Sequence, residues 1–171
     1  MTNDSFKTQD PVMITPEQIY EWLEEVKDPE IPVLSLVDLG VITEVKITNN
    51  DVSIEMTPTF VGCPALDMMK SEIVTVLKKH GIEEVEIVVT FRKPWTSDRI
   101  SEKGKVALKK FGLAPPPPNA LFTELEILEN AQCPRCDGMN TELKTPFGAT
   151  LCRAIFYCHD CKEAFEQFKP V

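Results

Sequence analysis

Residues 52–91 read VSIEMTPTFVGCPALDMMKSEIVTVLKKHGIEEVEIVVTF. The first five residues alternate apolar with polar, which is typical of a strand that buries one face. From about 64 to 79 the apolar residues recur at helical spacing, and Gly81 then ends the predicted helix. The buried face of this helix is expected to comprise Leu66, Met69, Ile73, Val76 and Leu77. A second strand is predicted from alternating Val85, Ile87, Val89 and Phe91.

The sequence before this stretch adds one more helix and one more strand. Thr15 and Gln18 form a capping box that begins a helix, and we expect it to end near Lys27 before a proline-rich segment. Alternating residues 41–48 predict a strand, and Asn49-Asn50 is a turn signal leading into the next one. The predicted order is α-β-β-α-β, so the fold class is α+β, with helices layered on one small sheet.

A run of four prolines, Pro115–Pro118, divides the chain, because consecutive prolines cannot continue a helix and form a stiff spacer. A last helix is predicted just before it, over about 101–111. We therefore expect an α+β domain over 12–113, a proline-rich linker over 114–119 and a second module over 120–171.

The second module carries two C-x-x-C pairs, whose thiolates can complete a tetrahedron around one metal ion: Cys133, Cys136, Cys158 and Cys161. A structural zinc ribbon is the favoured interpretation, and a rubredoxin-like iron site or two redox dithiols are the alternatives. His159 is expected to be exposed, because four thiolates already complete the shell. Short strands are predicted over 140–145, 153–157 and 164–168. Their small core is expected to comprise Ile155, Tyr157, Phe165 and Phe168, too little to hold the module without metal.

The overall charge excludes broad classes of partner. The chain has 171 residues and a net charge of −9, whereas nucleic acids and anionic membranes attract cationic surfaces. The polar N-terminus and the absence of a long apolar run argue against a signal peptide or a spanning helix, so we expect a cytoplasmic protein.

Cys63 stands apart from the ribbon, between a predicted strand and the N-terminus of the predicted helix. A helix N-terminus stabilises a thiolate, so the pKa of Cys63 is expected to be depressed. Such a thiol can be a metal ligand, a nucleophile or a redox sensor, and the alternative is a buried small hydrophobe. Asp28, Glu30 and Asp38 are possible oxygen ligands beside it, although Asp28 is better explained as the cap of a turn.

The segment 92–110 is basic within an otherwise acidic chain. Its cations are expected mainly to form a solvated helix face. The alternative is a docking surface for an acidic protein or for phosphates, with Lys103, Lys105 and Lys109 at its centre. Trp95 is either an exposed anchor of that surface or a core residue.

These motifs, in this order, resemble a known family. The segments that carry the resemblance to the iron–sulfur assembly domain of SufT-like proteins are DPEIP (28–32), VDLG (37–40), TPT (57–59) and GCPA (62–65). The segments that narrow it to the PaaD family, accessory subunits encoded with phenylacetyl-CoA epoxidase, are PWTSD (94–98), CPRC (133–136), TLC (150–152) and FEQFK (165–169). Together they cover about 15–169.

The resemblance implies an accessory role without catalysis of its own, in which metal centres of the epoxidase are assembled or maintained. The implied client is the iron–sulfur reductase subunit, and the alternative is the di-iron oxygenase subunit. The family's reactive cysteine falls on Cys63, which would handle transient iron or a cluster, and its zinc ligands fall on the ribbon cysteines. Cys152 matches a further cysteine of the pattern, and it is otherwise explained as a ribbon core residue. The sequence departs from the pattern at Val61, Arg99 and Pro170, where a terminal cysteine often occurs.

Three other functions remain open. The chain can be a structural docking subunit that transfers no metal, or a thiol-redox enzyme in which Cys152 resolves Cys63. A zinc-ribbon transcription factor fits the negative charge poorly. One thiolate cannot satisfy a cluster, so a partner, or a homodimer that places two Cys63 thiolates together, is expected to supply the rest.

Overall fold

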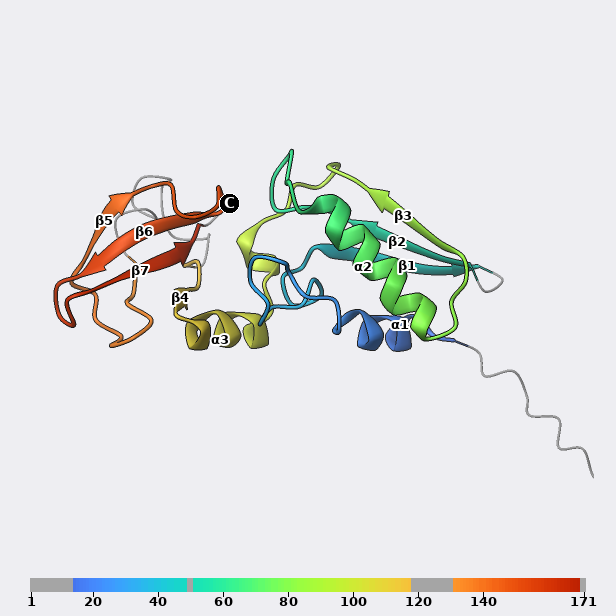
Figure 1. The fold of residues 1–171 in the computed structure, drawn as a ribbon, viewed down its shortest axis with the longest axis horizontal. Coiled ribbons are helices and arrows are strands. Elements are labelled where there is room, and N and C mark those ends of the chain that lie inside the picture. The colour runs from blue at the N-terminus through green and yellow to red at the C-terminus, as the bar shows by residue number, and fades with distance from the viewer. Residues whose placement is uncertain (1–13, 49–50, 118–130, 170–171) are drawn as a thin grey trace, which may run out of the picture.

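The computed structural model describes residues 14–48, 51–117 and 131–169. Outside these residues lie the predicted turn at Asn49-Asn50, residues 12–13 of the predicted first domain and residues 118–119 of the predicted linker. Residues 120–130 and 170–171 of the predicted second module, Pro170 among them, also lie outside. Figure 1 shows two sheets at opposite ends of the molecule, with the segment of α3 running beneath and between them. Among the described residues, no helix combines the length and the apolar character needed to cross a membrane.

The N-terminal part is a three-stranded sheet with helices packed on it, as the hydrophobic pattern predicts. Its central strand, β2, pairs antiparallel with β1 and parallel with β3. Its elements are α1 (Pro16–Leu23), β1 (Ile42–Thr48), β2 (Asp51–Met56), α2 (Leu66–Lys79), β3 (Val85–Val89), the 3-10 turn η1 (Ser97–Arg99) and α3 (Glu102–Phe111). The parallel β2–α2–β3 connection brings the end of β2 and the beginning of α2 to one end of the sheet.

The core lies between α2 and the sheet, and the expected apolar faces form it. On α2 the buried side chains are Met69, Ile73, Val76 and Leu77, and on β2 they are Val52, Ile54 and Met56. Two expectations were wrong. The helix α1 ends at Leu23 rather than near Lys27, because the backbone turns there and Val26 enters the core from a loop. Phe91 is exposed, because β3 ends at Val89.

The C-terminal part is a second sheet in the order β4-β7-β6-β5. Its strands are β4 (Leu113–Ala114), β5 (Thr141–Thr145), β6 (Arg153–Cys158) and β7 (Glu163–Phe168). The short strand β4 follows α3 directly and pairs in parallel with β7, so the chain joins the second sheet before the proline run. The boundaries expected for the two domains, 12–113 and 120–171, remain a prediction.

The core face of β6 is the one opposite to that expected. Ala154, Phe156 and Cys158 are fully buried, whereas Ile155 and Tyr157 are only partly buried. A single-residue shift exchanges the two faces of a strand, and alternation alone cannot decide between them when both faces carry apolar residues. The ring of Phe156 stacks on Phe165 at 5.6 Å and fills the space beside the cysteines.

Phe168 belongs to the N-terminal core instead of the ribbon core. Its ring lies 5.7 Å from that of Trp95, which is 2 % exposed and donates from Nε1 to the carbonyl of Leu39 at 2.9 Å. Trp95 is therefore a core residue, the second of the two roles considered for it. Arg153 on β6 also donates to the Glu30 carbonyl at 2.7 Å, so polar and apolar contacts fix the two parts together.

Candidate functional site

The two C-x-x-C turns bring four sulfur atoms into one cluster. The Sγ atoms of Cys133, Cys136, Cys158 and Cys161 all lie within 4.8 Å of one another. Cys133 lies 3.7 Å from Cys161, and Cys136 lies 3.6 Å from Cys158, both far longer than a disulfide bond. Four free thiols in this arrangement form a donor set that fits a tetrahedral metal ion.

The surroundings of these thiols favour a bound cation. Backbone N–H groups of Cys161 and Asp160 lower the pKa of Cys158 to about 7, although burial acts against them. Burial and the neighbouring thiols raise the pKa of Cys161 to about 12. The four groups cannot all ionise beside one another without a compensating charge, which a metal ion supplies. His159 is exposed and pairs with Glu142, as expected for a residue outside the shell.

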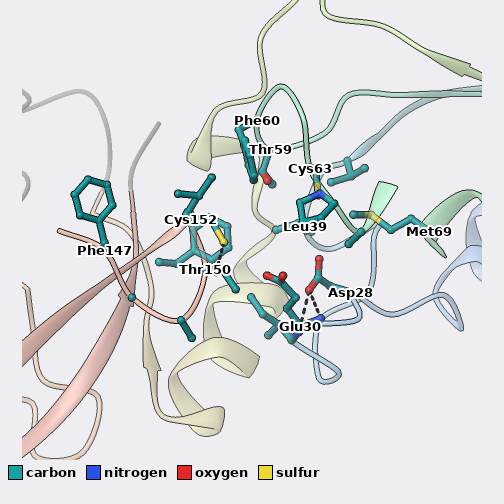
Figure 2. A pocket seen from close by; sticks show the side chains of 18 residues that line it. Asp28, Glu30, Leu39, Thr59, Phe60, Cys63, Met69, Phe147, Thr150 and Cys152 are labelled. Carbon is teal, nitrogen blue, oxygen red and sulfur yellow. Dashed lines mark hydrogen bonds between the residues drawn. The ribbon is translucent and has the colours of Figure 1, made fainter. Parts of the chain in front are cut away.

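A separate cavity of ≈ 290 Å³ lies where the two parts of the molecule meet. Three loops form most of its walls: the loop around 28–31, the loop 59–65 before α2, and the β5–β6 loop 147–152. Leu39, Val41, Met69 and Phe168 complete the lining. Figure 2 shows Cys63 and Cys152 on different sides of this hollow, with Asp28 and Glu30 below and between them. Both cysteines are free thiols.

Cys63 is held by a tight turn between β2 and α2. Gly62 has a φ of 84°, a left-handed conformation that favours glycine, and the Cys63 carbonyl accepts from the N–H of Leu66 at 3.3 Å. The expected depression of its pKa is wrong. Burial raises the pKa of Cys63, the Ala65 N–H only partly offsets this, and Asp28 and Glu30 raise it further. The helix itself begins at Leu66, three residues beyond the thiol.

Asp28 both caps a turn and faces the cavity. Its Oδ1 accepts from the N–H groups of Glu30 and Ile31, each at 2.9 Å, which confirms the capping role. The side chain is 9 % exposed and lines the same cavity as Cys63. Burial raises the pKa of Asp28, although the two N–H groups and Arg153 act in the opposite direction. Glu30 is exposed at the edge of the cavity.

Cys152 lies in the cavity wall, and the expectation that it fills the ribbon core is wrong. It is partly buried against the N-terminal core, with its Sγ 3.0 Å from the hydroxyl of Thr150. Burial raises the pKa of Cys152, and Glu30 and Asp28 add to the effect. Cys152 lines the same cavity as Cys63, as the thiol-redox alternative requires. The rest of the loop 147–152 was not predicted to contribute, because no local pattern indicates which loop docks against another domain.

Asp38 takes no part in the cavity and instead holds α3. Its Oδ1 accepts from the Ser101 hydroxyl at 2.6 Å, and its Oδ2 pairs with Lys103 at 3.0 Å. The three lysines expected at the centre of the basic segment all form ion pairs within the chain. Lys103 pairs with Glu24 and Asp38, Lys105 pairs with Glu102, and Lys109 pairs with Asp137. Each of these lysines therefore has an acidic partner within the chain.

Two family models match the chain, one for each part. The iron–sulfur cluster assembly protein family matches residues 16–89, and the PaaD zinc beta ribbon domain matches residues 117–169. The cavity lies between the matched regions, with Cys63 in the first and Cys152 in the second.

Curated and solved relatives agree with these matches. A protein of Escherichia coli described as a subunit of 1,2-phenylacetyl-CoA epoxidase is 34 % identical over 92 % of this chain and 96 % of its own. An Fe-S protein maturation auxiliary factor of Porphyromonas gingivalis is 36 % identical over 55 % of this chain and 90 % of its own. A Bacillus anthracis crystal structure, a domain of unknown function, is 36 % identical with a TM-score of 0.51, covering 54 % of this chain and 89 % of its own.

Proposed function

Because this chain belongs to the PaaD family of phenylacetyl-CoA epoxidase proteins, we propose that it assembles or maintains an iron–sulfur centre of that epoxidase through Cys63. The client is the reductase subunit of the epoxidase, which carries the iron–sulfur centre, rather than the di-iron oxygenase subunit. The protein acts in the cytoplasm as an accessory factor and catalyses no reaction of the substrate.

One observation carries this proposal: Cys63 lies in a cavity beside the carboxylates of Asp28 and Glu30. Thiolate and carboxylate are both ligands of iron, so the cavity presents donors that can hold it. Two relatives that match about half of this chain are described as Fe-S protein maturation auxiliary factors, which supports a role in metal handling.

The ribbon cysteines hold one structural zinc ion in this proposal. Four thiolates in a closed tetrahedral set leave no open position for a substrate, so the zinc stabilises the second sheet. Exposed apolar side chains on the loops beside the cavity, at Val61, Phe147 and Leu151, form a surface to which the client can bind.

The test is epoxidase activity in cells that express the complex with wild-type protein or with Cys63→Ser. We expect the variant to lose support of the activity while its zinc content and circular dichroism remain those of wild type. Ser71→Ala, an exposed change on α2, is the control and is expected to support full activity.

Full activity with Cys63→Ser contradicts metal handling by this thiol. If that variant also co-purifies normally with the other subunits, the protein is a structural docking subunit instead. Charge reversal at Lys93 and Lys110 then maps the surface, because these exposed lysines form no ion pair with another described residue.

A further inference from the structure

The cavity brings together two thiols that are distant in the sequence. Cys63 comes from the loop before α2, and Cys152 comes from the loop before β6 in the ribbon part. Each is only partly buried, so both can be reached from the ≈ 290 Å³ space. The close packing of the two parts through Phe168 and Arg153 keeps the two loops facing each other.

The two carboxylates of the cavity lie near both thiols, but a different one affects each thiol more. Burial is the largest cause of the raised pKa of each thiol. Of the two carboxylates, Asp28 raises the pKa of Cys63 more, and Glu30 raises the pKa of Cys152 more. The arrangement in Figure 2 agrees, with Asp28 on the side of Cys63 and Glu30 toward Cys152. Both carboxylates act on both thiols, and the stronger effects associate Cys63 with Asp28 and Cys152 with Glu30.

Asp28 offers a donor atom that the fold does not use. Its Oδ1 accepts two backbone N–H groups, whereas its Oδ2 accepts no hydrogen bond from any described residue. In Figure 2 this second oxygen points toward Cys63 and the hollow. Asp28 is 9 % exposed, and its two N–H donors and the nearby Arg153 only partly offset the effect of burial, so a cation in the cavity stabilises the ionised form.

The cavity donors do not lie close enough together for one ion to bind three of them. Among residues 14–48, 51–117 and 131–169, three or more ligand atoms gather within 4.8 Å of one another only at the ribbon. The cavity donors instead form two pairs on different sides. A cluster with two irons and two bridging sulfides leaves two open positions on each iron, which is one pair per iron.

We propose that the cavity binds a [2Fe–2S] cluster as cargo within one chain, with Cys63 and Asp28 on one iron and Cys152 and Glu30 on the other. This rests on the proposed function and names what Cys63 carries and which second thiol shares it. On binding, each S–H bond breaks as an Fe–S bond forms, the two protons pass to solvent, and no electron is transferred.

The experiment loads the full-length, zinc-containing protein anaerobically with ferric iron and sulfide, which form the cluster without a further oxidant. Iron, acid-labile sulfide and zinc are measured per chain, together with visible absorbance and native mass. We expect about two irons and two sulfides per wild-type monomer. Cys63→Ser and Cys152→Ser are each expected to bind the cluster at least about tenfold more weakly, with zinc unchanged.

Glu30→Gln tests the carboxylate, and Glu83→Gln, an exposed glutamate outside the cavity, is its control. We expect only Glu30→Gln to shift the visible spectrum. If Cys152→Ser still binds the cluster while Cys63→Ser does not, this inference is wrong and the proposed function stands. Normal loading of both cysteine variants overturns both. A cluster found only in a dimer, or iron bound without sulfide, also overturns the inference.

Discussion

At the residue scale, Asp38 shows how one buried carboxylate fixes the start of a helix. It accepts a hydrogen bond from Ser101, whose own hydroxyl caps α3 by accepting from the Gly104 N–H at 2.9 Å. Asp38 is 7 % exposed, and its second oxygen pairs with Lys103 at 3.0 Å. The carboxylate therefore links the loop 35–40 to α3, the last helix before the second sheet.

Asp38→Asn is expected to destabilise the protein by about 1.5–3 kcal/mol, because hydrogen bonds to a charged acceptor contribute about that much. Urea unfolding at neutral pH measures the change. Asp67→Asn is the control, because that side chain is 94 % exposed, and it is expected to change stability by less than about 0.5 kcal/mol. An equal effect of the two substitutions contradicts the role assigned to Asp38.

The contribution of Asp38 depends on pH with a definite sign. Burial acts to raise the pKa of its carboxyl, but hydrogen bonds from Ser101, Lys103 and Ser35 outweigh it and lower the pKa below its ordinary value. A pKa lower in the folded state stabilises the fold above the unfolded pKa, near pH 4. We expect the stability difference between wild type and Asp38→Asn to shrink as pH falls below about 4. A difference that grows on acidification contradicts this.

At the scale of elements, β7 belongs to both parts of the molecule. Its first residues pair with β6 beside the cysteine cluster, and Phe165 packs in the ribbon core. Its last residue, Phe168, is 1 % exposed in the N-terminal core beside Trp95. Because Phe168 also lines the cavity, the position of the ribbon affects the cavity through this one strand.

Phe168→Ala is expected to cost about 3–5 kcal/mol, the usual range for truncating a buried phenylalanine. The second result expected is faster hydrogen exchange at both 147–152 and 59–65, because the two cavity loops lose their common support. Phe111→Ala, at a side chain that is 45 % exposed, is the matched control. Exchange changes confined to the ribbon strands contradict the bridging role of β7.

At the scale of the whole molecule, the two parts differ in what holds them together. The N-terminal core contains many large apolar side chains from helices, strands and loops, among them Ile19, Leu23, Ile54, Ile73 and Leu77. The ribbon core has few, and its buried members include the cysteines Cys133 and Cys158 themselves. We therefore expect the second sheet, but not the first, to depend on metal.

Removing the metal with a chelator is expected to unfold β5, β6 and β7 while α1, α2 and α3 persist. Far-ultraviolet circular dichroism then keeps most of its helical signal, and hydrogen exchange becomes fast from 131 to 169. Cys133→Ser is expected to reproduce this state without chelator. Loss of the helices at the same chelator concentration as the strands contradicts the difference in stability between the two parts.

The secondary structure and the two-part organisation could be predicted from local patterns in the sequence. Apolar spacing in 52–89 is a local property, so it predicted β2, α2 and β3 within a few residues. The spacing of the C-x-x-C pairs likewise predicted the sulfur cluster, because two short turns geometrically bring their thiols together. The burial of individual faces was less predictable, as Ile155 and Phe156 show, since both faces of β6 carry apolar residues.

Only the tertiary structure decided what surrounds Cys63. The sequence places a thiol near a helix N-terminus, and this local view predicted a lowered pKa. The fold buries that thiol and turns Asp28 and Glu30 toward it, and together these effects raise the pKa. Cys152 reaches the same cavity only because Phe168 and Arg153 dock the ribbon against the first domain. Burial and charge proximity depend on contacts between distant segments, and no local pattern encodes them.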